Sequence, residues 1–424
     1  MTKKSNLEQA VILCGGLGTR LRPLTDNLPK PMVEVNGKPF LYHLLKQLSE
    51  QGVTRFLLLT GYLGERISKH FSDGSQYGWS ISYSHGPTEW DTGRRLWEAR
   101  TQCDSQFLLL YSDNFVQFRL HQLENLHCEL CTPISLLLAP KSKGNIKLSE
   151  GGRIQAYDKE RKGVGLDYVE VGYMAVDSDR VFKDFPSCSN FPDFNFSVLL
   201  EIYAKQQKVG GLVVRDPYHS ISDPPRLAMM CEYLKPKKIL LIDRDGTINE
   251  KAAKGEYITN WHDFKWAPHL IEALALLGAD GFKFIVITNQ AGIARKMIEP
   301  ESLDDIHKKM SVGLKECGVD VLKIYVSPHH WDENSFMRKP APGMFFQAAR
   351  EFSLRMDRTL YVGDDERDCI AAANAGCGMV YLSDKSEELA LKLASYPEPI
   401  IYGRNLLEKV DEIRRIYYEW EQNA

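Results

Sequence analysis

Short, fully apolar runs recur through the first half of the chain, and segments with helical periodicity separate them. The first run, AVILCGG at residues 10–16, ends in glycines, which is typical of a buried parallel strand that enters a tight turn. Helical stretches at 42–51 and 65–70 then alternate with strand-like runs at 55–60, 106–113 and 133–140. Strands that alternate with helices predict an α/β sheet with crossover helices.

The alternation restarts in the second half after an interruption. The segment CEYLKPKK at 231–238 places a proline between lysines, and KILLIDRDGT then begins a new buried strand that ends in acidic residues. Helical stretches at 268–277, 304–317 and 343–352 alternate with strand-like runs at 282–289, 323–328 and 359–365. We therefore predict two Rossmann-like α/β domains, residues 1–232 and 236–424, the second with a helical extension that contains amphipathic segments at 387–395 and 405–422.

Composition narrows the classes of function. The formal net charge of the 424 residues is -3, so no basic field points to nucleic acid or to an anionic membrane. The apolar runs are far shorter than the roughly 20 residues that span a bilayer, and the N-terminus lacks the apolar segment of a signal peptide. The nine cysteines show no disulfide spacing, which suits the reducing cytoplasm. We expect a cytoplasmic protein with small-molecule partners, with a homo-oligomer left open.

A glycine-rich turn directly follows the first apolar run. Gly15, Gly16 and Gly18 let backbone N–H groups approach a triphosphate closely, and Thr19 and Arg20 extend the turn with a hydroxyl and a cation. The turn lacks the GK[ST] ending of a Walker A loop and is not a GxGxxG motif. It therefore indicates a phosphate-binding turn of another kind.

The continuation of this turn as PLT and then PKPM resembles the signature of the sugar-1-phosphate nucleotidylyltransferases, over roughly residues 9–230. The resemblance implies a mixed sheet and a reaction in which a sugar phosphate oxygen attacks the α-phosphorus of a nucleoside triphosphate and pyrophosphate leaves. Such a transfer needs charge neutralisation and alignment more than a protein nucleophile. By the resemblance, Arg20 holds the triphosphate, Lys30 polarises the α-phosphate, and Asp113 and Asp223 bind Mg²⁺. An ordinary loop carboxylate is the alternative for Asp223.

Further positions match the sugar-binding and base-binding regions of these enzymes. By the resemblance, the sugar phosphate and sugar hydroxyls meet Lys159, Glu170 and Gly172. Where relatives often have LGTGG, this chain has WDTGRR, in which Asp91 and Gly93 lie near the base. A carboxylate at Asp91 can accept hydrogen bonds from guanine N1–H and N2–H₂, a pattern that adenine does not offer. The departure therefore favours GTP as a hypothesis.

Two carboxylates, Asp243 and Asp245, follow the strand-like run KILLI, and their spacing suits a nucleophile and an acid/base on one metal. The segments TNQ at 288–290, RKP at 338–340 and GDDERD at 363–368 follow in order. This series resembles the haloacid-dehalogenase superfamily of phosphatases, which implies a parallel sheet. By the resemblance, Asp243 forms an aspartyl-phosphate, and Asp245 protonates the leaving oxygen and later activates water.

The same resemblance assigns the other groups of this second site. The phosphate and substrate contacts fall to Thr288, Asn289, Arg338 and Lys339, the Mg²⁺ ligands are Asp243, the backbone carbonyl of Asp245 and Asp364, and Asp368 orients the site. DRDGTIN, TNQAGIAR and RKPAPGM narrow the resemblance to D-glycero-D-manno-heptose-1,7-bisphosphate phosphatases and their histidinol-phosphatase relatives. Those proteins usually carry a zinc-bound loop of the form CPH…CxCRKP. Ser327, Ser335 and Met337 replace its cysteines here, so we predict no structural zinc.

Together the two resemblances predict consecutive reactions. The phosphatase removes the C7 phosphate of heptose 1,7-bisphosphate, and the transferase couples the resulting heptose 1-phosphate to GTP, giving GDP-heptose and pyrophosphate. One alternative keeps both chemistries but uses another sugar phosphate or nucleotide, such as a hexose 1-phosphate with dTTP, CTP or ATP. Another makes one domain a degenerate binding or regulatory module, against which the complete set of phosphatase motifs argues.

Overall fold

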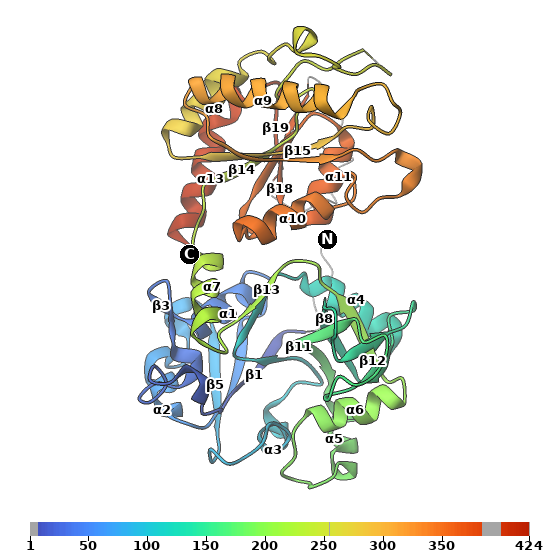
Figure 1. The fold of residues 1–424 in the computed structure, drawn as a ribbon. Helices are drawn as coiled ribbons and strands as arrows, with labels where there is room; N and C mark the ends of the chain where they lie inside the picture. Colours follow the sequence, from blue (N-terminus) through green and yellow to red (C-terminus); the bar gives the residue numbers. More distant parts are fainter. Residues whose placement is uncertain (1–6, 254, 384–399, 424) are drawn as a thin grey trace. The chain divides into compact units, whose positions relative to one another are not determined.

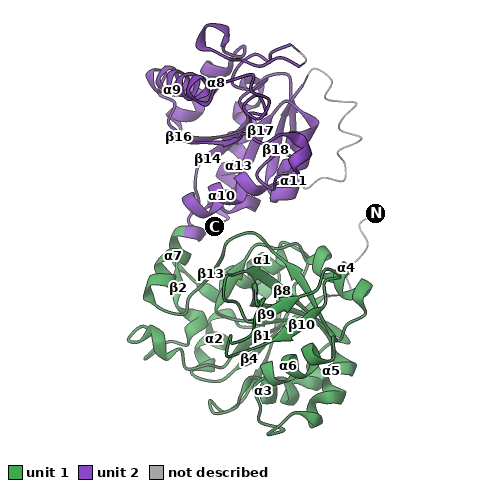
Figure 2. Cartoon of the chain, turned by 45° about the vertical axis from the view of Figure 1, so that its right-hand side comes forward, with its two compact units in different colours: residues 1–232 green, residues 233–424 purple. Residues whose placement is uncertain are grey.

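The computed structural model describes residues 7–253, 255–383 and 400–423, and the chain divides into two compact units, Met1–Glu232 and Tyr233–Ala424 (Figure 2). Each unit has its own sheet and its own hydrophobic core. The amphipathic segment expected at 387–395 lies outside the described residues.

Unit 1 is built on a nine-stranded mixed sheet, whose main path runs β10-β9-β11-β6-β1-β4-β5 (Figure 1). Off this path, β8 pairs with β11, and β12 pairs with β8. Its strands are β1 Gln9–Cys14, β4 Arg55–Thr60, β5 Ser80–His85, β6 Gln106–Tyr111, β8 Ile134–Pro140, β9 Ile146–Leu148, β10 Ile154–Tyr157, β11 Tyr168–Asp177 and β12 Val209–Val213. Strand β1 is parallel to β4 and β6, whereas β11 is antiparallel to β6 and β8. Two small ribbons pair β2 Glu34–Val35 with β3 Lys38–Pro39, and β7 Asn114–Val116 with β13 Tyr218–Ser220.

The helices of unit 1 are α1 Phe40–Ser49, α2 Gly64–Phe71, α3 Thr92–Glu98, α4 Leu120–Leu130, α5 Ser178–Asp184, α6 Ser197–Lys205 and α7 Pro224–Leu234, which ends just inside unit 2. Every residue of β1 is buried, which explains why its sequence is a continuous apolar run. Leu96 of α3, Val181 of α5 and Leu199 of α6 pack with Val11 and Leu109 of the sheet in one core. These helices therefore cover one face of the sheet and leave the carboxyl ends of β1, β4 and β6 for the turns that follow them.

Unit 2 contains a six-stranded sheet in which all pairs are parallel, in the order β16-β15-β14-β17-β18-β19. Its strands are β14 Ile239–Ile242, β15 Lys283–Asn289, β16 Val321–Ser327, β17 Leu360–Gly363, β18 Gly378–Leu382 and β19 Ile400–Gly403, and its helices are α8 Leu270–Ala279, α9 Pro300–Glu316, α10 Gly343–Phe352, α11 Glu366–Ala375 and α13 Val410–Gln422. The mixed sheet of unit 1 and the parallel sheet of unit 2 confirm the predicted fold class.

The two faces of the parallel sheet carry separate cores. Leu240 and Ile242 of β14 pack with α8, α9 and α13, whereas Leu241 between them packs with α10 and α11. Figure 1 shows α9 and α10 on opposite sides of this sheet. Helix α13 is fastened at Tyr417, whose hydroxyl donates to the Ile239 carbonyl at 2.5 Å. The two-sided burial leaves the carboxyl ends of the strands, where the acidic motifs lie, as the open edge.

Candidate active sites

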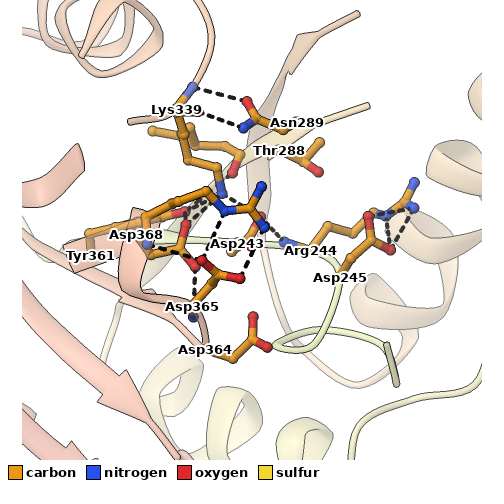
Figure 3. Close-up of polar contacts among 12 residues, drawn as sticks. Asp243, Arg244, Asp245, Thr288, Asn289, Lys339, Tyr361, Asp364, Asp365 and Asp368 are labelled. Atoms are coloured by element: carbon orange, nitrogen blue, oxygen red, sulfur yellow. Dashed lines mark hydrogen bonds and ion pairs between the residues drawn. The ribbon is translucent and has the colours of Figure 1, made fainter. Parts of the chain in front are cut away.

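Asp243 follows β14 at the middle of the parallel sheet, and neighbouring strands bring the other motifs to it. Lys339 Nζ lies 2.7 Å from Asp243 Oδ1 and 2.8 Å from Asp368 Oδ1 (Figure 3). The Tyr361 hydroxyl donates to Asp368 Oδ1 at 3.0 Å. Asp243 is 7% exposed and Lys339 is 4% exposed. Asp243 thus lies beside a buried cation that it shares with a second buried carboxylate, Asp368, an arrangement that fits the nucleophile expected at Asp243.

Burial governs the charge state of this pair. It raises the pKa of the Asp243 carboxyl to about 7, against the opposing charge of Lys339. Burial alone would lower the pKa of the Lys339 ammonium, but Asp243 and Asp368 outweigh it and the pKa is raised. A further cation at this position would stabilise the ionised form of Asp243.

The residues around Asp243 fit a hard divalent cation. One carboxylate oxygen each of Asp243, Asp364 and Asp368 lies within 4.8 Å of the others, and among the described residues this is the one group of three or more His, Cys, Asp or Glu side chains so placed. Asp364 Oδ1 is buried and has no hydrogen-bond partner. A Cβ at Gly246, where φ is +90°, would lie 2.3 Å from Asp364 Oδ2, so glycine lets the backbone after Asp245 approach this carboxylate. Carboxylate and carbonyl oxygens are the ligands that Mg²⁺ prefers.

The Asp245 carboxylate is turned away from Lys339 toward the Arg244 guanidinium (Figure 3), and Asn249 and Gln290 also donate to it. Arg244 Nη2 lies 2.6 Å from Asp245 Oδ1, and Gln290 Nε2 donates to Oδ2 at 2.7 Å. Burial raises the pKa of Asp245, but Arg244 outweighs it and the net pKa is lowered. Arg244 is 1% exposed, and its Nη1 lies 3.2 Å from His307 Nε2. The sequence did not predict Arg244, Gln290 and His307 as positioning residues. The one local signal for such a role was an arginine, Arg244, just after a buried strand.

Asn289 positions Lys339 through the backbone. Its Nδ2 donates to the Lys339 carbonyl at 3.0 Å, and its Oδ1 accepts from the Lys339 N–H at 3.0 Å (Figure 3). Thr288 is 1% exposed, and its hydroxyl accepts from Gln290 Nε2 at 2.9 Å. Both amide atoms of Asn289 thus serve the loop that carries Lys339.

A cavity of about 720 Å³ opens over this centre. Of the residues that the sequence predicted, its lining includes Asp243, Asp245, Thr288, Asn289, Arg338 and Lys339, whereas Asp364 lies outside the lining. The sequence missed Lys251, Tyr257, Arg295 and Trp331, which also line it. Arg295 lies over the rings of Tyr257 and Trp331, at 5.7 and 5.6 Å from their centroids. The cavity therefore combines the centre formed by Asp243 and Lys339 with aromatic and cationic walls.

In the loop where other residues replace the expected zinc-binding cysteines, the carboxylate of Glu333 contacts both histidines. Glu333 Oε2 lies 2.9 Å from His329 Nδ1, and Glu333 Oε1 accepts from the His330 N–H at 2.7 Å. Arg338 Nη1 donates to the His329 carbonyl at 3.0 Å. These contacts connect the turn Trp331–Glu333 to the cavity-lining Arg338, and the absence of zinc stays a prediction.

In unit 1, a cavity of about 360 Å³ lies at the carboxyl ends of β1 and β6. Its lining includes these predicted residues: Gly15, Gly16, Gly18, Thr19, Arg20, Lys30, Asp91 and Asp113. Lys30 Nζ lies 2.6 Å from Asp113 Oδ2. A Cβ at Gly18, where φ is +62°, would lie 2.9 Å from Lys30 Cβ, which ties the glycine turn to the lysine. The first site therefore has its phosphate turn, lysine and acidic strand end in one cavity.

Asp223 reaches this region through the ribbon of β7 and β13. The Ile221 N–H donates to the Asp113 carbonyl at 2.9 Å, and Ser222 lines the cavity. The Asp223 carboxylate itself accepts from the Arg226 N–H at 3.0 Å at the start of α7. It lies outside the cavity lining, so its role as a metal ligand stays a prediction.

Gly93, predicted near the base, and Lys159, Glu170 and Gly172, predicted at the sugar, also lie outside this lining. Glu170 Oε1 accepts from the Tyr157 hydroxyl at 2.6 Å, and Glu170 Oε2 is buried without a hydrogen-bond partner. Burial raises the pKa of Glu170, against the charge of Lys159. A Cβ at Gly172 would lie 2.8 Å from the ring of Tyr111, so a larger residue would displace that wall of the cavity.

Asp91 caps α3 through one of its two carboxylate oxygens. Its Oδ1 accepts from the Thr92 N–H at 2.8 Å and from Asn195 Nδ2 at 3.0 Å, as the N-cap of α3. Its Oδ2 makes no hydrogen bond with a residue that the structure describes. Arg95 follows on the same helix and lines the cavity, and no sequence pattern predicted a role for it.

Within the described ranges, no helix has the length and apolarity needed to cross a membrane.

Comparisons with known proteins match the two parts of the chain to different families. The family model for nucleotidyl transferases matches residues 9–154, and the model for polynucleotide kinase 3 phosphatases matches residues 238–376. D-glycero-beta-D-manno-heptose-1,7-bisphosphate 7-phosphatase of Bordetella bronchiseptica is 31% identical over 161 residues, which are 38% of this chain and 89% of that protein. A probable glucose-1-phosphate cytidylyltransferase of Bacillus subtilis is 34% identical over 140 residues, which are 28% of this chain and 55% of that protein.

Among solved structures, the heptose 1,7-bisphosphate phosphatase of B. bronchiseptica, complexed with magnesium and phosphate, is 29% identical with a TM-score of 0.39, and the match covers 42% of this chain and 98% of that one. The family matches confirm the predicted nucleotidylyltransferase part and the predicted phosphatase part. The chain is therefore an enzyme with two chemistries.

Proposed function

The chain belongs to the heptose-1,7-bisphosphate 7-phosphatase family and carries a nucleotidyl transferase domain before it, and from that premise we propose that its two units catalyse consecutive steps. Unit 2 removes the C7 phosphate of D-glycero-D-manno-heptose 1,7-bisphosphate. Unit 1 then couples the heptose 1-phosphate to GTP, giving GDP-heptose and pyrophosphate. We place both reactions in the cytoplasm, with Mg²⁺ as the cofactor of both units.

Two cations in the cavity of unit 2 without ion-pair partners among the described residues are the observation that favours a bisphosphate substrate. Lys339 faces the nucleophile, but Arg295 and Arg338 line the same cavity and form no ion pair with any carboxylate that the structure describes. Two guanidinium groups without anionic partners favour a ligand with a second phosphate. A heptose that carries phosphates at both ends supplies one group for Asp243 and one for the arginines.

The phosphatase step follows from the positions of Asp243 and Asp245. An Asp243 oxygen attacks the phosphorus, the bond to the sugar oxygen breaks, and that oxygen takes a proton from Asp245. The incoming phosphate adds negative charge near Asp245 and so favours its protonated form, against the pull of Arg244. Water then gives a proton to Asp245 and attacks the aspartyl-phosphate, which releases phosphate and regenerates Asp243. When bound by Asp243, Asp364 and the Asp245 carbonyl, Mg²⁺ supplies charge neutralisation for the phosphoryl oxygens.

In the transferase step, an oxygen of heptose 1-phosphate attacks the α-phosphorus and the bond to pyrophosphate breaks. Lys30, which lies 2.6 Å from Asp113, would offset charge at the α-phosphate, while the glycine turn and Arg20 hold the leaving groups. Mg²⁺ held by Asp113, with Asp223, adds charge neutralisation when bound. The unused Oδ2 of Asp91 supports guanine as the base.

One experiment tests the whole proposal. The purified chain is incubated with heptose 1,7-bisphosphate, Mg²⁺ and each nucleoside triphosphate in turn, and phosphate, pyrophosphate and nucleotide-sugar are followed by mass. The proposal expects release of the C7 phosphate and formation of GDP-heptose. Faster turnover of CTP, which the B. subtilis relative's name suggests as the second candidate, or of ATP or UTP would refute the choice of GTP.

The second-phosphate assignment has its own test. Arg295→Ala should raise KM for the bisphosphate about tenfold and leave the hydrolysis of p-nitrophenyl phosphate unchanged. Arg350→Ala, at an exposed position of α10, is the matched control. Equal loss on both substrates would remove Arg295 from the substrate site.

A further inference from the structure

Arg95 is a buried cation in the wall of the nucleotide cavity of unit 1. Its side chain is 5% exposed, and it extends from α3 into the lining. Nη1 donates to the Thr60 carbonyl at 2.8 Å, and Nη2 donates to the Pro87 carbonyl at 2.6 Å. Longer bonds reach the carbonyls of Gly86 and Thr88, at 3.4 and 3.3 Å. Backbone carbonyls therefore satisfy this guanidinium, and it forms no ion pair within the described part of the chain.

These hydrogen bonds lie at the ends of two neighbouring strands, and the guanidinium packs beside the end of a third. Strands β1, β4 and β5 lie side by side and parallel. Thr60 ends β4, and the carbonyls of 86–88 belong to the turn after β5. After β1, a Cβ at Gly15 would lie 2.3 Å from Arg95 Cζ, and after β4, a Cβ at Gly61 would lie 2.6 Å from Arg95 Nη2. The guanidinium thus lies flat against the glycine turn while it holds the turn after β5.

The two turns that Arg95 contacts line the same cavity. The glycine turn contributes Gly15, Gly16, Gly18, Thr19 and Arg20, and the segment after β5 contributes Thr88, Trp90 and Asp91. A nucleoside triphosphate that binds here needs its phosphates and its base at a fixed separation. Lys30 is paired with Asp113, whereas Arg95 has only neutral hydrogen-bond partners, so its charge remains available to an anion in the cavity.

We propose that Arg95 is a positioning residue of the nucleotide subsite, which sets the spacing between the phosphate-binding turn and the base-binding segment 86–91. This inference rests on the proposed function of unit 1 and adds to it a residue that determines nucleotide affinity and base selectivity. A planar guanidinium with paired donors can hold the carbonyls at the end of β4 and in the turn after β5 while it packs against Gly15, whereas a lysine ammonium cannot reproduce that geometry.

Arg95→Lys is the decisive variant, because it keeps the charge and removes the planar fork. We expect KM for the preferred nucleoside triphosphate to rise about tenfold or more, with kcat within about threefold and KM for the sugar phosphate unchanged. The ratio of kcat/KM between the preferred nucleotide and the other three should fall as well. Arg100→Lys is the matched control: this residue also donates to a backbone carbonyl, that of Trp97, but lies outside the cavity lining.

A purely structural role predicts a different outcome. It would lower the Tm of Arg95→Lys but leave KM and the selectivity ratio at their wild-type values, and that result overturns the proposal. Arg95→Ala with added guanidinium at low millimolar concentration provides a second measurement: recovery of nucleotide affinity supports the role, and no recovery in a folded variant contradicts it. Phosphate release by unit 2 is followed in each preparation.

Nucleotide binding to the whole chain separates this inference from the proposed reaction. If the wild-type chain binds a Mg-nucleotide but forms no nucleotide-sugar, the proposed reaction fails, and the affinities of Arg95→Lys and Arg100→Lys still decide the role of Arg95. If the wild-type chain binds none of the four nucleotides, both the reaction and the positioning role are wrong.

Discussion

Lys339 Nζ lies 2.7 Å from Asp243 Oδ1, in an ion pair whose members are both almost excluded from solvent. Asn289 fixes the backbone of the lysine, and Asp368 shares its ammonium. Removing one member of a buried pair leaves an uncompensated charge. The pair therefore links the chemistry of the phosphatase to the packing of its sheet, and substitutions must keep the shape of the side chain.

Asp243→Asn should abolish phosphate release while nucleotide transfer continues at the wild-type rate. The amide keeps the size of the side chain but cannot attack phosphorus, so we expect a loss of about 10⁴-fold or more. Phosphate release from the bisphosphate and pyrophosphate release from preformed heptose 1-phosphate measure the two activities. Residual phosphate release within tenfold of wild type would show that Asp243 is not the nucleophile.

Lys30→Ala should give the opposite pattern. The substitution removes the cation beside Asp113, and a loss of transition-state charge stabilisation of this kind costs about 10²-fold to 10³-fold in kcat. Phosphate release by unit 2 should not change. Lys38→Ala, outside the cavity, serves as the control, and an equal loss of transfer in that variant would count against the assignment.

The positions of the strands and of their motifs could be predicted from the sequence, because apolar runs and strand ends are local features. The burial of all six residues of β1 and the position of Asp243 at the end of β14 could both be read from short segments. Contacts between side chains that are distant in the chain could not be predicted in this way. Arg95 meets Thr60 across 35 positions, and Arg244 meets His307 across 63.

Polar side chains were hardest to assign, because one group can serve several partners. The TNQ motif suggested that Asn289 binds substrate, yet both its amide atoms hold the Lys339 backbone. The spacing of Asp243 and Asp245 suggested a shared site, and both line one cavity, but no pattern predicted that Arg244 and Gln290 would hold the Asp245 carboxylate. Which partner a polar side chain binds depends on the donors that the fold brings near it, and no local sequence pattern predicts those donors.

Metal removal should distinguish magnesium from zinc. EDTA is expected to stop phosphate release, and added Mg²⁺ to restore it, because Asp243 and Asp364 offer oxygen ligands. A zinc-selective chelator should leave the rate unchanged, since Ser327, Ser335 and Met337 offer no thiolates. Metal analysis of the purified chain checks this directly, and one zinc per chain would contradict the prediction.

His307 should make unit 2 lose stability in mild acid. Burial, together with the neighbouring charge of Arg244 and against that of Asp245, lowers the pKa of the His307 imidazole from 6.5 to about 4. The folded state therefore binds fewer protons than the unfolded state between these values, so stability from this group is complete above pH 6.5 and is lost as pH falls toward 4. The full difference corresponds to roughly 3 kcal/mol.

His307→Asn removes this titration and should flatten the unfolding free energy of unit 2 between pH 6.5 and 4, even if it lowers stability at neutral pH. Denaturant unfolding at several pH values, followed by a probe confined to unit 2, measures the profile. His262→Asn, at an exposed position, should keep the wild-type slope. The protonated imidazole would place a second cation against the buried Arg244, which is why the slope should belong to His307. An unchanged slope in His307→Asn would move the acid sensitivity to the carboxylates around Asp243.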